Sequence, residues 1–179
     1  MHLSKKDAQD ILENALSWLV VLAMFIYGGA KIIQFDGAAQ IDKAVSELTG
    51  MELMWAFYGY SKPFAITLGI LEITGGLLIL IRRTRLLGCL FTSTILVNVI
   101  LQDIYYGVNQ GALRAAIWYQ LAIILILWLH REKLIRSLKA LLAMDSPGHS
   151  RNKLFLKLFI AFVLFVGLRI LEYYLTAKW

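Results

Sequence analysis

Five apolar runs, each long enough to cross a lipid bilayer, limit what this chain can fold into more than any other feature. A hydrocarbon core about 30 Å thick needs about 20 largely apolar residues per helix. Such a run must be helical, because its backbone N–H and C=O groups find no water in lipid. The sequence predicts an all-α, polytopic membrane helical bundle with these spans: Leu16–Phe35, Phe64–Ile81, Leu86–Ile104, Leu113–Leu129 and Leu154–Leu175.

The composition agrees with a chain that faces lipid. Hydrophobic residues make up 59% and charged residues 17% of the sequence, against about 45–50% and about 25% in soluble domains. Cys89 is the one cysteine, which excludes an internal disulfide and a C-x-x-C redox pair. The 3 histidines lack the spacing of metal ligands, so no metal site is expected.

The basic residues predict how the chain is oriented. Flanks rich in Lys and Arg stay cytoplasmic. With a cytoplasmic N-terminus, twelve of the 18 Lys and Arg residues fall on that side and five on the other, while Arg169 lies within a span. We therefore expect a multi-pass protein of a cell membrane, the bacterial cytoplasmic membrane being the natural setting, with an external C-terminus. The basic flanks favour membrane lipids over nucleic acid as partners.

The spans divide the chain into four expected parts. These are a cytoplasmic N-terminal segment (1–14), a four-helix membrane domain (15–129), a cytoplasmic amphipathic linker (130–153) and a fifth transmembrane helix with the external C-terminus (154–179). Within the linker, residues 130–143 place Leu and Ile at helical spacing beside Lys and Arg, which is typical of a helix at the membrane surface. That helix is expected to stop at the Ser-Pro-Gly sequence of residues 146–148. In the longest external loop, Ile41, Val45 and Leu48 have the spacing of a short surface helix.

Polar residues inside the spans gather in the half expected to face outward, whereas the inner half is nearly all aliphatic. An ionisable group at this depth costs at least about 2.5–3.5 kcal/mol, so it needs a partner or water. Tyr27 and Lys31 share one helix face, as do Asn98 and Gln102. These positions predict an outward-opening pocket with Glu72 at its floor and Lys31 as its countercharge. A buried Glu–Lys pair that only ties helices together is the alternative.

Three motifs between residues 51 and 108 carry a family resemblance. They are W-x-F-x-G-Y-S at 55–61, G-x-x-E at 69–72 and R-R-T at 82–84. Together with the YGGAK sequence at 27–31, they resemble the DoxX family of membrane proteins over residues 15–129. The resemblance implies a four-helix membrane bundle and, for the member that gave the family its name, an association with quinone-linked sulfur oxidation. After the third span the chain departs from the family pattern, since Asp103 and residues 106–109 replace an Asn followed by Tyr-Asp-Val-Pro.

The candidate site residues have two expected roles. Glu72 and Lys31 are the catalytic candidates, because a carboxyl group can accept or relay a proton while a lysine holds its charge or polarises a carbonyl group. The remaining candidates would bind a ligand through their polar or aromatic side chains: Tyr27, Tyr60, Asn98, Gln102, Asp103 and Tyr119.

Two kinds of function agree with these residues, and whether the protein is an enzyme stays open. The first is a redox-associated subunit that binds a quinone from the membrane, or a similar amphipathic small molecule. It would need a membrane or peripheral redox partner subunit, because the chain has no dinucleotide motif and no paired axial-ligand His. The second is a non-catalytic lipid-binding or assembly (chaperone) subunit. A homo-oligomer is compatible with both, and the lack of an inverted repeat disfavours transport.

Overall fold

The computed structural model describes residues 4–142 and 151–176. Within these residues the chain forms seven α-helices and two 3₁₀ helices and contains no strand, so the predicted all-α class is confirmed. The chain divides into two compact units, Met1–Ile135 and Arg136–Trp179.

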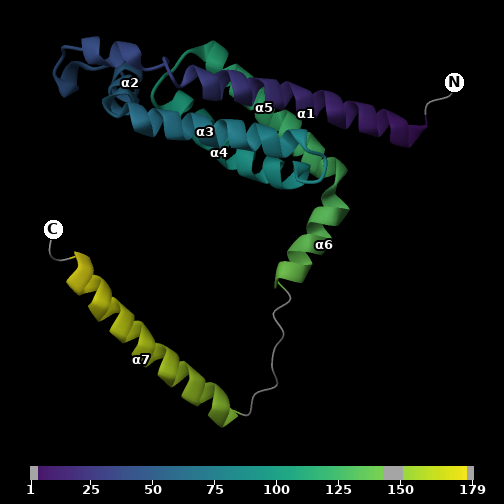
Figure 1. Ribbon diagram of the computed structural model, residues 1–179, viewed down its shortest axis with the longest axis vertical. Coiled ribbons are helices and arrows are strands. Elements are labelled where there is room, and N and C mark those ends of the chain that lie inside the picture. Colours follow the sequence, from purple (N-terminus) through teal and green to yellow (C-terminus); the bar gives the residue numbers. More distant parts are fainter. Residues whose placement is uncertain (1–3, 143–150, 177–179) are drawn as a thin grey trace. The chain divides into compact units, whose positions relative to one another are not determined.

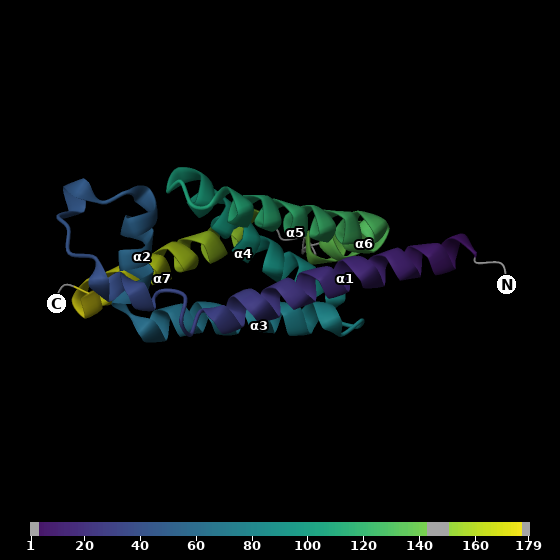
Figure 2. The same ribbon diagram turned by 90° about the horizontal axis from the view of Figure 1, so that it is seen from above.

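Four long helices form the first unit (Figures 1 and 2): α1 (Lys5–Ala30), α3 (Lys62–Leu80), α4 (Arg85–Tyr105) and α5 (Gln110–Leu129). Helices α1 and α4 each pack against both α3 and α5, which closes a ring of four. All four are long and apolar enough to cross a membrane, as is α7 (Arg151–Thr176) of the second unit. The predicted multi-pass membrane architecture therefore agrees with the helices observed. For the last four spans, both ends of the observed helix differ from the expected ends by less than one helical turn.

Helix α1 begins well before the expected span and ends earlier. A capping box fixes its start: Ser4 Oγ accepts a hydrogen bond from the Asp7 amide at 3.2 Å, and Asp7 Oδ2 accepts one from the Ser4 amide at 2.9 Å. After Ala30 the chain turns, with the Ile33 amide bonded to the Ala30 carbonyl group at 3.0 Å. Residues 5–14, which were expected to precede the first span, thus form the first turns of α1.

The expected surface helix on Ile41, Val45 and Leu48 is wrong. That part of the chain forms two 3₁₀ helices, η1 (Asp36–Gln40) and η2 (Val45–Glu47), joined by extended residues. Neither 3₁₀ helix has a side-chain cap, and both helices are short, as is typical of this helix type.

An α-helix does form in this connection, but further along the chain, as α2 (Gly50–Tyr60). Thr49 caps it, because its Oγ1 accepts from the Glu52 amide at 3.2 Å while Glu52 Oε2 accepts from the Thr49 amide at 2.9 Å. The Thr-x-x-Glu capping box, rather than the apolar spacing, marks where this helix begins. Figure 1 shows α2 at one end of the bundle, which we name the α2 end.

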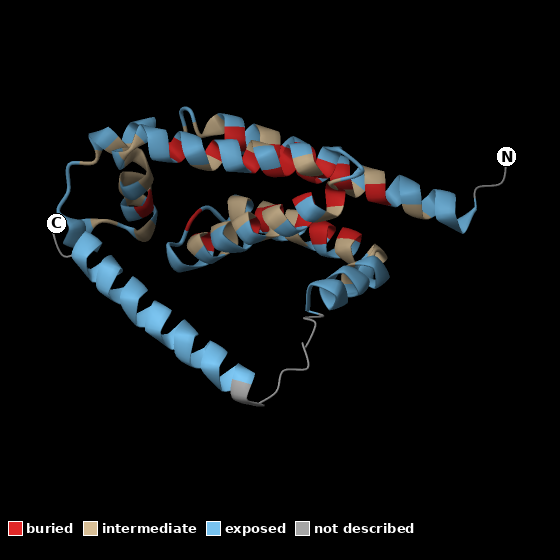
Figure 3. Ribbon diagram, turned by 60° about the horizontal axis from the view of Figure 1, so that its bottom comes forward, coloured by how far each residue is buried: buried red, intermediate tan, exposed pale blue. Residues whose placement is uncertain are grey.

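Glycines let α1 and α3 approach closely near the α2 end. A Cβ atom added at Gly28 would lie 2.6 Å from the carbonyl oxygen of Gly69, so only glycine fits there. Towards the middle of the bundle, Val20, Ile79 and Ile123 are fully buried. Figure 3 shows that the buried residues of the first unit lie on helix faces turned towards the other helices, while the outward faces are exposed.

The remaining helices match the expected segments. Helix α6 (Arg131–Leu142) covers the predicted amphipathic stretch and has no buried residue. Helix α7 is apolar around most of its circumference and is long enough to cross a membrane. Arg169, which lies within the last span, donates a hydrogen bond to Glu172 across one turn, so its charge is paired. The expected break at residues 146–148 lies outside the described residues.

We predict that Gly28→Ala lowers the free energy of unfolding by about 1–3 kcal/mol, because the new methyl group meets backbone that cannot move away cheaply. Thermal unfolding of the purified protein in detergent measures the effect. Gly29→Ala is the matched control, since no atom lies within 4 Å of a Cβ atom added there. Equal melting temperatures for the two variants would show that α1 and α3 are not this close.

Candidate functional site

A cavity of about 330 Å³ lies inside the bundle near the α2 end, and we name it the pocket. Its size falls at the lower end of the range of about 300–1,000 Å³ found for small-molecule sites. Helices α1 to α5 all contribute to its wall. Of the eight residues predicted for the site, seven line the pocket: Tyr27, Lys31, Glu72, Asn98, Gln102, Asp103 and Tyr119.

Tyr60 does not line the pocket, so its predicted place in the site is wrong. Its side chain is 93% exposed at the last residue of α2. Tyr58, two residues earlier, lies in the pocket wall. Positions i and i+2 of a helix point about 200° apart, so the two tyrosines cannot face the same cavity.

Lys31 and Glu72 meet in the wall of the pocket. The Lys31 ammonium nitrogen Nζ lies 3.3 Å from Glu72 Oε1, and it donates a hydrogen bond to Gln34 Oε1 at 2.9 Å. Both side chains are nearly buried, at 12% and 6% exposure. Glu72 Oε2 is buried without a hydrogen-bond partner. The ion pair expected from the sequence is therefore present, and one carboxylate oxygen stays unsatisfied.

Aromatic residues that were not among the predicted site residues form a second part of the wall. Tyr58 donates a hydrogen bond to Gln102 Oε1 at 2.7 Å, joining α2 to α4. The Phe35 ring stacks on Tyr58 with centroids 5.1 Å apart and meets Trp55 edge-on at 5.2 Å. Burial raises the pKa of Tyr58, which keeps its hydroxyl group a hydrogen-bond donor at neutral pH. The Thr-x-x-Glu capping box was the sequence signal that could have placed Trp55 and Tyr58 on a helix beside the bundle.

Two exposed ion pairs hold the connection that carries α2. Lys43 contacts Glu52 at 2.6 Å, and Lys62 contacts Asp36 at 3.2 Å. Hydrogen bonds from Lys43 and Thr49 lower the pKa of Glu52 to about 2. The Glu52 carboxylate in the capping box of α2 therefore stays ionised at physiological pH. Exposed pairs of this kind contribute at most about 1 kcal/mol each, so they orient α2 without locking it.

Asp103 contributes a second carboxylate to the pocket. It is 7% exposed, near the end of α4, and its Oδ2 is buried without a partner. Its backbone carbonyl group accepts from the Val108 amide at 3.1 Å, which fixes the turn into α5. Gly107 supplies the positive φ of 62° in this turn, a conformation that side-chain-bearing residues rarely adopt.

A polar cluster at the opposite end of the bundle, which we name the Arg85 end, was missed by the sequence reasoning. Arg85 NH1 donates to Glu13 Oε1 at 2.7 Å, and His130 Nε2 lies 2.8 Å from Glu13 Oε2. Arg85 Nε also donates to the Ile79 carbonyl oxygen at 3.1 Å. Arg85 is 2% exposed and Glu13 8%.

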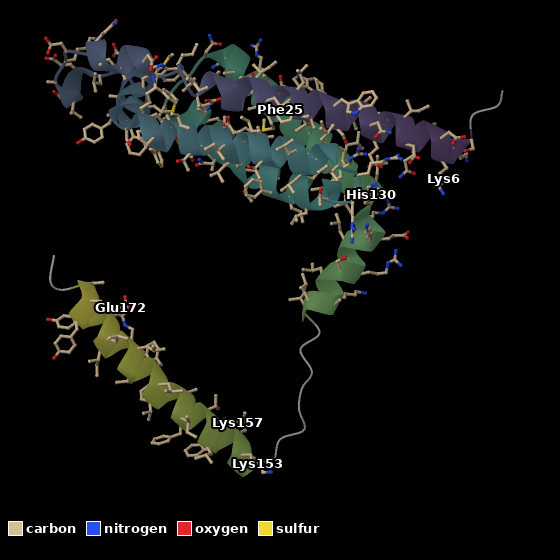
Figure 4. The ribbon with its side chains drawn as sticks, viewed as in Figure 1. Lys6, Phe25, His130, Lys153, Lys157 and Glu172 are labelled. Carbon is tan, nitrogen blue, oxygen red and sulfur yellow. The ribbon has the colours of Figure 1, made fainter. Side chains whose placement is uncertain are left out.

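The expectation of a nearly all-aliphatic inner half applied to the predicted spans, and the three residues of the cluster lie just outside those spans. Glu13 falls within the expected N-terminal segment (1–14), yet it is buried in α1, and Arg85 at the start of α4 is buried as well. The cluster joins α1, α3 and α4 to His130, which lies at the junction of α5 and α6 away from α2 (Figure 4). All three residues lie within three positions of an expected span, which the sequence shows, but this spacing does not indicate that they meet.

We predict that Arg85→Met lowers the free energy of unfolding by about 3–5 kcal/mol, because it leaves the Glu13 carboxylate buried with one partner fewer. Unfolding in detergent, followed by circular dichroism, measures the loss. Arg82→Met is the control: the Arg82 and Asp10 side chains are 63% and 52% exposed in their ion pair, so its loss should cost at most about 1 kcal/mol. Similar losses for both variants would contradict the structural role given to the Arg85 end.

Comparison with known proteins identifies a relative of this chain. The "Uncharacterized protein YwoB" of Bacillus subtilis (strain 168) is 32% identical over 132 residues, which cover 72% of this chain and 83% of YwoB. No protein-family model matches the chain, and no solved structure matches it. The DoxX resemblance thus stays a proposal, whereas the likeness to YwoB is specific and covers most of both chains. The chain belongs to the same family as YwoB, as a multi-pass membrane protein with a pocket at one end of a four-helix bundle.

Proposed function

We propose that this protein binds an amphipathic small molecule in the membrane, with the polar head of that molecule in the pocket. The observation that carries the proposal is the Lys31–Glu72 pair in the wall of a cavity of about 330 Å³. Charged side chains inside a membrane bundle usually face its interior or a cavity, where they mark functional sites, and rarely face lipid. The excess of basic residues on the other side of the spans supports an external α2 end, so the pocket would take its ligand from the outer half of the membrane.

A membrane quinone is the ligand suggested by the resemblance to the DoxX family. Glu72 would then accept or relay a proton, and Lys31 would hold that charge or polarise a quinone carbonyl group. The Tyr58–Gln102 hydrogen bond and the amide group of Asn98 offer polar contacts for the ring. Electrons would have to come from a redox partner subunit, and the protein would act as one part of a membrane complex.

A non-catalytic role in binding lipid or assembling a complex is the second candidate. The observation that favours it is the packing around the ion pair, since the Gly28–Gly69 contact lies one turn from Glu72 and brings α1 against α3. In that case the pair holds the two helices in register, and the fully exposed α7 would dock a partner.

The variant Glu72→Gln separates these functions, because it keeps the shape of the side chain and removes its titratable proton. We predict that decylubiquinone binds the purified wild-type protein and that binding takes up or releases one proton. The affinity should then change by up to about tenfold per pH unit. Glu72→Gln should still bind this quinone, with an affinity independent of pH. Isothermal titration calorimetry between pH 5 and pH 8 measures both.

Glu47→Gln is the control for this experiment, since Glu47 lies in η2 outside the pocket and should leave the pH dependence intact. A wild-type affinity that does not vary with pH would contradict the proton-relay role of Glu72 and favour the non-catalytic function. Failure of decylubiquinone to bind at any pH would exclude the quinone as ligand.

A further inference from the structure

The charges that line the pocket do not balance. Glu72 and Asp103 bring two carboxylates, and Lys31 brings one ammonium group. Lys31 is already engaged, because its Nζ contacts Glu72 Oε1 at 3.3 Å and Gln34 Oε1 at 2.9 Å. With these groups ionised, the pocket wall therefore has one formal negative charge in excess, which Asp103 carries.

Asp103 has no hydrogen-bond or ion-pair partner among the described residues, and Lys31, the cation that acts on its charge, is bonded to Glu72 and Gln34. Asp103 takes part in none of the ion pairs or side-chain hydrogen bonds formed within residues 4–142 and 151–176, and its Oδ2 is buried without a donor. At 7% exposure the side chain is more than nine-tenths buried. An ionised carboxylate in such a place is strongly disfavoured unless a cation or donors reach it. The pocket thus lacks one positive charge.

Aromatic rings surround the same cavity. Tyr27 and Tyr119 meet edge-on with their centroids 6.2 Å apart, and Phe35, Trp55 and Tyr58 form a second group. The face of an aromatic ring attracts a cation through the negative charge of its π electrons, and the attraction is stronger where water is excluded. Rings together with an unpaired carboxylate are the groups that recognise an ammonium ion.

We propose that the head of the ligand is a cation, namely the ammonium group of an amphipathic amine, and that Asp103 is the residue that pairs with it. This inference rests on the proposed function, because it takes the pocket to be a ligand site, and it names the class of ligand. A neutral quinone head leaves the Lys31 ammonium group as the one positive charge in the pocket wall beside two carboxylates, whereas an ammonium group of the ligand supplies a second. The aromatic rings and the Met24 side chain would contact the apolar part of the molecule next to its charge.

A pair of probes of nearly the same shape tests this directly. In detergent at pH 7, 4-phenylbutylamine carries a positive charge and 4-phenylbutanol does not. We expect the full-length wild-type protein to bind the amine at least about tenfold more tightly than the alcohol in isothermal titration calorimetry, since a desolvated cation gains from both the carboxylate and the rings. Asp103→Asn should remove that preference, and Asp103→Glu should retain it.

The matched control is Asp36→Asn. Asp36 is exposed, pairs with Lys62 and lies outside the pocket, so this variant should keep the wild-type preference for the amine. Equal affinities of the wild-type protein for the amine and the alcohol would overturn the inference, and this comparison holds even if Asp103→Asn fails to fold. If decylubiquinone binds while the amine does not, the inference fails and the proposed function stands. If none of the three probes binds, both fail.

Discussion

The cost of placing charge in a hydrocarbon environment determines how this protein is organised. Its long helices are apolar enough that the few ionisable residues within them decide how the helices meet. At the Arg85 end, Glu13 has two partners, and Arg85 donates hydrogen bonds to oxygen atoms of two neighbouring helices, α1 and α3. At the α2 end, Lys31 and Glu72 pair, yet a carboxylate oxygen of Glu72 and one of Asp103 stay unsatisfied. The charged groups are thus paired at the Arg85 end, whereas at the α2 end two carboxylate oxygens have no hydrogen-bond partner.

This contrast gives the two ends different roles. The satisfied cluster holds α1, α3 and α4 against the start of α6, and between the two ends Val20, Ile79 and Ile123 fill the bundle with buried apolar side chains. At the α2 end the helices enclose a cavity instead, and α2 contributes aromatic residues to its wall. Chemistry or binding can therefore take place near α2, while the far end keeps the bundle together. Membership of the family of YwoB adds no chemistry to this picture, so the pocket residues themselves have to carry the argument.

The sequence predicted those features that follow from hydropathy and helical spacing. Apolar runs of spanning length located the long helices, and the common face of Tyr27 and Lys31 pointed to the pocket. The sequence alone did not predict the features that depend on which helices become neighbours. Nothing in a single sequence shows that Glu13, Arg85 and His130, far apart along the chain, meet in one cluster. Tyr60 was chosen over Tyr58 because a motif contains it, although helical geometry allows one of the two to face the cavity.

An experimental structure of the protein in lipid nanodiscs made from native membrane lipids, at a resolution that shows side chains, tests the central claim most directly. Our account predicts additional density in the cavity bounded by Trp55, Glu72 and Tyr119, from an elongated molecule whose head lies beside the carboxylates and whose tail leaves the bundle. The Lys31–Glu72 pair would persist beside it. A cavity closed by the surrounding side chains, with the Glu72 carboxylate facing lipid and separated from the Lys31 ammonium group, would contradict the account.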